Sequence, residues 1–195
     1  MSGANQSGAQ AAVQTVGPLD GQEISCACGA TRFVCDGPPI IVTECYCDSC
    51  RKAAAMLEML PGALPLLEPT GGTHFVLYRK DRVSPVTSTE HLREHRLAPD
   101  SSTRRIVATC CNSPMFLDFA HGHWFSVYAQ RFPPAIRPPI EERTMLMDMP
   151  KDFTPPPGAR HPKRWSVSFF ARLFWAWARM GFRTPKEEWV RGSLP

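Results

Sequence analysis

Eight cysteines, seven of them in tight groups, constrain this 195-residue chain more than any other feature of its sequence. The seven form a C-x-C pair, a C-x-C-x-x-C run and an adjacent pair, namely Cys26 and Cys28; Cys45, Cys47 and Cys50; and Cys110 and Cys111. Cys35 stands apart at the end of a predicted strand, where a small buried thiol is expected. The N-terminal residues lack the pattern of a secretory signal, so we expect a cytoplasmic, reducing environment. Clustered cysteines in such an environment favour metal ligands over disulfides.

The spacing of these groups predicts two Zn²⁺ sites. Zinc takes four protein ligands in a structural site, and three plus an open position in a catalytic site. Three thiolates from the compact run at Cys45, Cys47 and Cys50 match the second pattern. Cys26 and Cys28 need partners far along the chain, and Cys110 and Cys111 form the remaining pair. Structural zinc in both groups, a catalytic metal, and redox-active or unpaired thiols all stay open at this point.

Short apolar runs between Gly and Pro turns predict a mainly β fold of small antiparallel sheets. The expected strands are 31–35, 40–43, 73–79, 104–109, 115–119 and 124–128, with helical turns at 51–60. The predicted organisation is a flexible tail at 1–20, a zinc-binding β domain at 21–132, a proline-rich linker at 133–164, and an amphipathic helix with a C-terminal tail at 165–195. The linker prediction rests on nine prolines, which lack an amide donor and fix φ. The charged run at 90–96 is expected to be a solvated helical face or a loop.

The segment 165–183 predicts a helix with a wide apolar face. Its polar positions repeat at helical spacing, at Ser168, Arg172, Arg179 and Arg183. From residue 131 onward there are twelve Lys or Arg against six Asp or Glu, in a chain whose net charge is +4. Three roles stay open: packing on the β domain or across a homodimer, lying on an anionic membrane surface, and docking in a partner's groove. No motif for nucleic-acid binding is present.

Four motifs in this order resemble the glutathione-dependent formaldehyde-activating enzyme family, whose domain also occurs in centromere protein V. They are CACGATRF from Cys26, DGPP from Asp36, CYCDSCRK from Cys45 and CNSPM from Cys111. The resemblance covers about residues 21–132. It implies a β-tent fold with a catalytic zinc on Cys45, Cys47 and Cys50 and a structural zinc on Cys26, Cys28 and Cys111. Within the triad we assign the catalytic role to Cys47.

The resemblance also implies the chemistry of a carbon–sulfur lyase. Zinc lowers the pKa of a bound thiol, and a glutathione thiolate can then add to an aldehyde such as formaldehyde. Glutathione is anionic, so Arg51 and Lys52 after the triad, and the pair Arg104 and Arg105, are candidate contacts. Otherwise these four are ordinary solvated charges. The alternative function is a non-enzymatic zinc domain that presents 165–183 to a membrane surface or a protein partner.

The late motif departs from the family pattern C-x-x-C-G-S. Its first cysteine falls on Ala108, so one ligand of the structural zinc is missing. Cys110 can replace it only if a bulge or turn brings it to the same side as Cys111, because adjacent side chains on a strand face opposite ways. Otherwise the site has three thiolates, another fourth ligand or no zinc. Tyr46 stands where the family commonly has histidine, and Asn112 replaces a glycine, which is a mild change.

Overall fold

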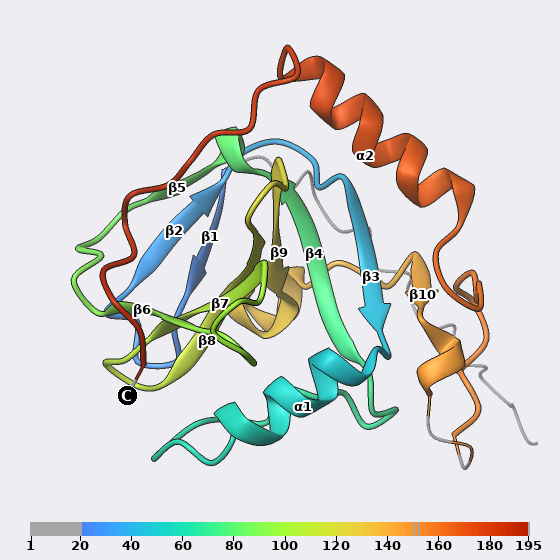
Figure 1. Cartoon of the computed structure of the whole chain (residues 1–195), viewed down its shortest axis with the longest axis horizontal. Helices are drawn as coiled ribbons and strands as arrows, with labels where there is room; N and C mark the ends of the chain where they lie inside the picture. Colours follow the sequence, from blue (N-terminus) through green and yellow to red (C-terminus); the bar gives the residue numbers. More distant parts are fainter. Residues whose placement is uncertain (1–20, 150, 152, 195) are drawn as a thin grey trace, which may run out of the picture.

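The computed structural model describes residues 21–149, 151 and 153–194, so the predicted tail at 1–20 lies outside them. Within these residues the fold is mainly β, as predicted, with two helices (Figure 1). The strands are β1 (Gln22–Ser25), β2 (Arg32–Cys35), β3 (Ile41–Cys45), β4 (Thr73–Arg79), β5 (Val83–Pro85), β6 (Leu92–His95), β7 (Thr103–Ala108), β8 (Ser113–Phe119), β9 (Trp124–Tyr128) and β10 (Glu142–Thr144). The α-helices are α1 (Asp48–Leu57) and α2 (Val167–Arg179).

The described strands form two sheets. The smaller has the order β1-β2-β5, and the larger has the order β10-β3-β4-β9-β8-β7-β6. Neighbouring strands are antiparallel except for β10 and β3, which run parallel with Glu142 opposite Thr43. The proline-rich segment expected as a linker therefore supplies an edge strand of the larger sheet. Its side chains are held there by an ion pair of 2.8 Å between Arg143 and Glu44, both buried.

The larger sheet is buried on both faces, which gives the protein two hydrophobic cores. Successive side chains of a strand point to opposite faces, so Val76 and Tyr78 of β4 pack toward the smaller sheet. Phe75 and Leu77 pack on the other face, with α1, α2 and the C-x-C-x-x-C run. This explains why the four central residues of β4, Phe75 to Tyr78, are all apolar or aromatic. The second face holds the candidate site.

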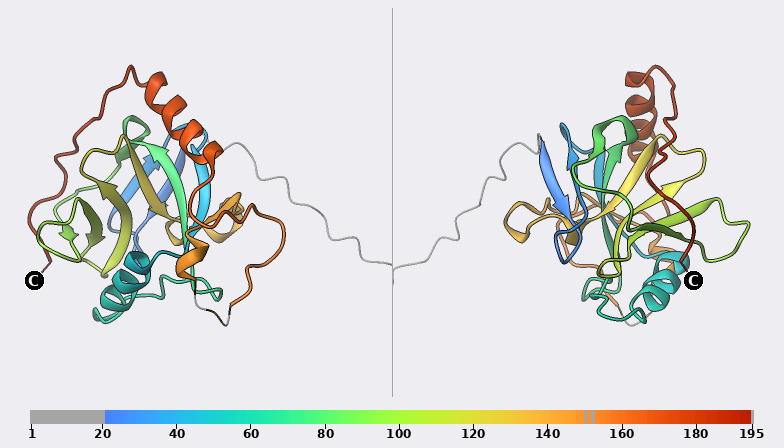
Figure 2. Two further views of the ribbon diagram at one scale, coloured as in Figure 1. Left: turned by 45° about the vertical axis from the view of Figure 1, so that its right-hand side comes forward. Right: turned by 90° about the vertical axis from the view of Figure 1, so that its left-hand side faces the viewer.

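Helix α2 is fastened to this second face at its start and its middle. The Ser166 hydroxyl accepts a hydrogen bond from the Phe169 amide at 3.0 Å, which caps the helix, and donates to Glu142 at 2.6 Å. Farther along, the ring Nε2 of His123 lies 2.9 Å from the Leu173 carbonyl oxygen. After α2 the chain crosses back over the molecule to β6, where Leu194 pairs with Glu94 (Figure 2).

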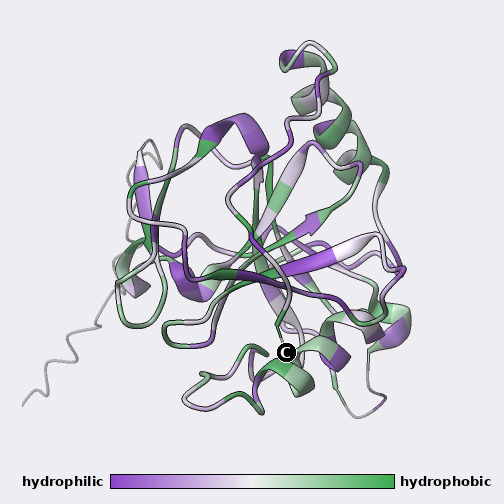
Figure 3. Ribbon diagram, turned by 60° about the vertical axis from the view of Figure 1, so that its left-hand side comes forward, coloured by the Kyte–Doolittle hydropathy of each residue, from purple (hydrophilic) through white to green (hydrophobic). Residues whose placement is uncertain are grey.

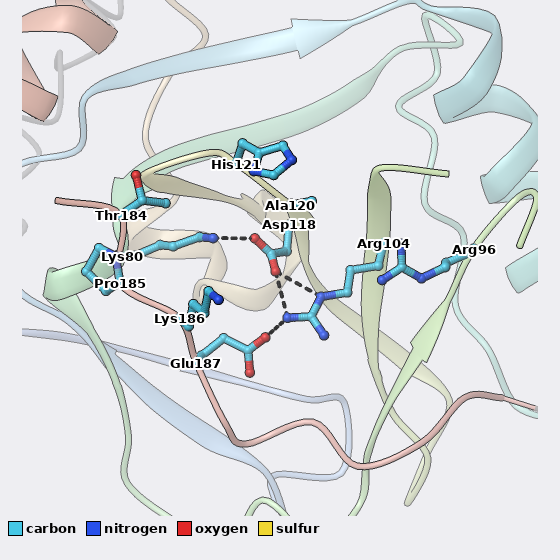
Figure 4. A pocket seen from close by; sticks show the side chains of 10 residues that line it. All are labelled: Lys80, Arg96, Arg104, Asp118, Ala120, His121, Thr184, Pro185, Lys186 and Glu187. Carbon is cyan, nitrogen blue, oxygen red and sulfur yellow. Dashed lines mark hydrogen bonds and ion pairs between the residues drawn. The ribbon is translucent and has the colours of Figure 1, made fainter. Parts of the chain in front are cut away.

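A charged cluster holds this returning segment against the sheet (Figure 4). Asp118 forms ion pairs with Lys80 at 2.7 Å and Arg104 at 2.9 Å. Arg104 also pairs with Glu187 of the returning segment. The cluster borders a hollow of about 380 Å³. Because Asp118, Lys80, Arg104 and Glu187 satisfy one another, we assign them a structural role.

The charged run at 90–96 differs from the prediction of a helix or loop, because Leu92–His95 forms strand β6. It pairs antiparallel with β7, with Leu92 buried opposite Ala108. A partner strand supplies hydrogen bonds that the run's own spacing does not indicate. Four-residue edge strands carry too little local pattern to be told from loops.

Candidate metal centre

The three cysteines of the C-x-C-x-x-C run meet where β3 ends and α1 begins. Cys45 is the last residue of β3, Cys47 precedes the first residue of α1, and Cys50 lies in its first turn. Their three Sγ atoms lie within 4.8 Å of one another. The tight turn is closed by the Cys50 amide, which donates to the Cys47 carbonyl at 3.0 Å. A helix N-terminus favours thiolates, since its free amides and dipole attract negative charge.

The three thiols are so close together that their pKa values differ widely. Hydrogen bonds from Cys45 and Cys50 lower the pKa of Cys47 to about 2, and the Ser49 hydroxyl lies 3.1 Å from the same sulfur. The hydrogen bond with Cys47 raises the pKa of Cys45 to about 12. Three thiolates this close repel one another unless a cation takes the place of the protons. The donor set therefore fits Zn²⁺, and among the described residues no fourth Cys, His, Asp or Glu joins the group.

A buried arginine lies behind the triad loop. Arg105 of β7 is 1% exposed, and its guanidinium donates to the Ser49 carbonyl at 3.0 Å. Zn²⁺ with three thiolates has a net charge of −1, so a neighbouring buried cation is favourable there. Arg104 points to the opposite face, into the cluster of Figure 4, because strand side chains alternate. The sequence did not distinguish the roles of these two adjacent residues.

Arg51 and Lys52 lie on α1, where the structure gives them other surroundings. Arg51 pairs with Asp48 one turn earlier, and Lys52 is exposed. Neither side chain lines the cavity beside the triad. A role for them in binding an anionic thiol stays a prediction.

The triad forms part of the wall of a cavity of about 510 Å³. The remainder of the wall comes from the second face of the large sheet, from Thr144 and Met145 after β10, and from Trp165 and α2. Phe169, Phe170 and Leu173 are the contributions of α2. The sequence predicted an apolar face for this helix, but its place against the triad appears only in the folded chain.

The other four clustered cysteines also come together. The Sγ atoms of Cys26, Cys28, Cys110 and Cys111 lie within 4.8 Å of one another. The Sγ–Sγ distances are 3.5 Å for Cys26–Cys28, 3.7 Å for Cys26–Cys110, 3.6 Å for Cys28–Cys110 and 4.0 Å for Cys110–Cys111. A tetrahedral zinc with bonds of ~2.3 Å separates its sulfurs by ~3.8 Å. This cluster therefore fits a closed, four-thiolate zinc site.

A turn explains how Cys110 supplies the thiol that is missing at Ala108. Strand β7 ends at Ala108, and both late cysteines lie in the turn before β8, so the alternation of a strand does not apply to them. Asn112 completes the turn with a left-handed φ of 51°. Burial opposes ionisation of Cys111, but the Ser113 hydroxyl and the Cys28 amide lower its pKa to about 6. The cluster joins the turn before β2 to the turn before β8, and so links the two sheets.

The fold and these clusters define a class of protein: a mainly β domain with two cysteine clusters, one of four and one of three residues, that could each bind a metal ion. Residues 22–65 match the model of a family described as glutathione-dependent formaldehyde-activating enzyme, as the sequence motifs predicted. The matched segment holds Cys26, Cys28 and the whole triad, and Cys110 and Cys111 lie beyond it. A comparison with curated proteins finds no match.

Proposed function

We propose that this protein is a zinc-dependent, carbon–sulfur lyase-like enzyme that acts on thiol–aldehyde adducts at Cys45, Cys47 and Cys50. The observation that supports this most directly is a three-thiolate site in the wall of a cavity. Zinc held there would lower the pKa of a substrate thiol and so supply a nucleophile near neutral pH. Glutathione and formaldehyde are the substrates that the family's description suggests. A reducing compartment such as the cytoplasm would keep these thiols available.

The proposed reaction balances without a redox partner. In one direction the thiol sulfur bonds to the aldehyde carbon, and the carbonyl oxygen takes up the proton that the thiol releases. In the other, the hydroxyl loses that proton, the carbon–sulfur bond breaks and its electron pair returns to sulfur. In our proposal the three cysteines hold the cation, Arg105 offsets the negative charge, and α2 shields the cavity from bulk water.

Metal analysis of Cys47→Ser tests this proposal. We expect the reduced wild-type protein to bind about two zinc ions per chain, the variant to lose about one, and adduct cleavage to be abolished. Cys35→Ala is the matched control, because Cys35 belongs to neither cluster and should leave both ions in place. The double variant Cys26→Ser/Cys28→Ser should lose the other ion. Unchanged zinc content in Cys47→Ser would contradict the assignment.

We also propose that the outer face of α2 binds an anionic membrane surface. This face exposes Val167, Phe170, Phe174 and Trp175, with Val167 88% exposed. In Figure 3, α2 projects from the body at the upper right and is coloured largely hydrophobic. Residues 153–186 carry seven Lys or Arg and no Asp or Glu. Exposed aromatic residues beside an excess of cations favour an anionic lipid surface over an ordinary protein groove. Among the described residues no helix is long and apolar enough to cross a membrane.

Vesicle sedimentation tests the membrane proposal. We expect the protein to bind phosphatidylcholine vesicles that contain about a third phosphatidylserine, and to be released by salt. Phe174→Glu should weaken binding about fivefold or more, whereas Met59→Glu, at another exposed apolar position, should not. Binding that is absent, or equal in both variants, would contradict the proposal. A stable dimer that buries α2 would show that a second copy covers this face instead.

A further inference from the structure

Apart from the three cysteines, the cavity beside the triad has no ionisable side chain in its wall. Its lining contains neither Asp, Glu, Lys, Arg nor His. Apart from the three cysteines, its polar members are hydroxyl residues, namely Thr43, Ser49, Thr103, Ser126 and Thr144. The other ten are apolar: Phe75, Leu77, Leu117, Phe119, Trp124, Met145, Trp165, Phe169, Phe170 and Leu173. Six of these ten are aromatic.

We infer that this cavity selects an uncharged, apolar thiol or aldehyde, aromatic or of medium chain length, and disfavours glutathione. This inference deepens the proposed function and rests on it. The cavity volume of about 510 Å³ lies within the range of ordinary small-molecule sites. Binding against the apolar wall removes a hydrocarbon group from water, which makes the binding free energy more favourable. The cysteines form one part of the wall, where they can meet the reacting sulfur.

The charges of glutathione have no partners in this cavity. The tripeptide carries two carboxylates and one ammonium, and burying an ionised group without a partner is strongly unfavourable. Arg51 is paired with Asp48, and Lys52 is exposed and does not line the cavity. Arg105 is near, but its guanidinium donates to the Ser49 carbonyl behind the triad and does not line the cavity.

Phe170 provides a way to change the charge of the cavity without disturbing the core. Its side chain lines the cavity and is also 55% exposed. A lysine at this position can place its ammonium at the cavity edge while its stem covers apolar surface. Val167 lies one turn earlier on α2, is 88% exposed and does not line the cavity. Phe170→Lys and Val167→Lys therefore add the same charge to the same helix, inside and outside the site.

The test compares benzyl mercaptan with glutathione on the zinc-loaded, full-length protein. Binding is followed by calorimetry and by the fluorescence of Trp124 and Trp165 in the cavity wall. We expect wild type and Val167→Lys to bind benzyl mercaptan at least about tenfold more tightly than glutathione, and Phe170→Lys to reduce this ratio severalfold. A wild-type ratio below about tenfold, or the same ratio in both lysine variants, would overturn the inference.

The two proposals fail in different ways. If Cys47→Ser keeps its full zinc content, the proposed metal site fails, whatever the thiol preference of the cavity. If Cys47→Ser loses one zinc but the wild type prefers glutathione, the metal site stands and the apolar substrate class is wrong.

Discussion

At the scale of single residues, the alternation of a strand divides two adjacent arginines between unrelated tasks. Arg104 faces the ion-pair cluster that holds the C-terminal segment. Arg105, one residue later, is buried behind the triad and donates to the Ser49 carbonyl in the first turn of α1. Its position lets it fix the carbonyl of Ser49 and offset the charge of the thiolates. We therefore regard Arg105 as a positioning residue for the metal centre.

Replacing each arginine in turn should separate these tasks. Arg105→Gln should lower the zinc affinity of the triad by ~10–100-fold, because it removes a charged group that supports the ligands. Arg105→Lys should fall between, since it keeps the charge and loses the planar donor. Competition with a chromophoric chelator measures the affinity. Arg104→Gln is the control and should leave it unchanged, and equal losses in Arg104→Gln and Arg105→Gln would contradict the assignment.

Among the elements, helix α2 has two sides with different roles. Its inner side closes the cavity with Phe169 and Leu173, and its outer side exposes aromatic residues. Both roles depend on how firmly the helix is attached to the larger sheet. Ser166 is central to this attachment, because one hydroxyl caps α2 and also donates to buried Glu142 of β10.

Ser166→Ala should loosen α2 without unfolding the sheets. Loss of an N-cap costs ~1 kcal/mol, and Glu142 also loses a hydrogen-bond donor, so we expect a decrease of ~1–2 kcal/mol in the free energy of unfolding. Amide hydrogen exchange in α2 should become faster than in wild type, whereas exchange in β4 should not change. Ser88→Ala, in an exposed loop, should change stability by less than ~0.5 kcal/mol. Exchange in α2 as slow as in wild type would refute the capping role.

For the molecule as a whole, the buried His74 makes the stability of the fold depend on pH. His74 of β4 is buried beside Glu68, with Nδ1 3.9 Å from the carboxylate. Burial, followed by the charge of Arg137, lowers the pKa of His74 to about 4 from 6.5, while the charge of Glu44 acts in the opposite direction and Arg143 adds to the lowering. The folded protein thus holds a neutral imidazole where the unfolded chain would bind a proton.

This difference predicts that acid destabilises the protein through His74. Between pH 6.5 and 4 the unfolded chain binds more protons, so the free energy of unfolding falls as the pH falls, by up to ~3 kcal/mol for this group. Urea unfolding of zinc-loaded wild type and His74→Gln at pH 7 and pH 4.5 measures the effect. The variant should lose less stability than wild type, and metal loss common to both cancels in the comparison. Equal losses would rule out His74 as the source.

The amino-acid sequence alone was enough to predict the strongly patterned strands and the grouping of Cys45, Cys47 and Cys50. The segments 73–79 and 124–128 were predicted with the bounds that the structure shows, because their apolar and β-branched residues leave little choice of local structure. The family motifs likewise lie within short segments, so the match at 22–65 follows from local sequence.

Features that depend on partners distant in the chain appear only in the folded protein. Strands β6 and β10 are three or four residues long, and each exists because a neighbouring strand supplies its hydrogen bonds. Cys110 joins Cys26 and Cys28 because the turn after β7 carries it there. The largely apolar cavity arises where α2 packs over the triad, from residues more than a hundred positions apart. Local sequence patterns indicate which faces of the elements are apolar, but the tertiary fold determines which of those faces pack together.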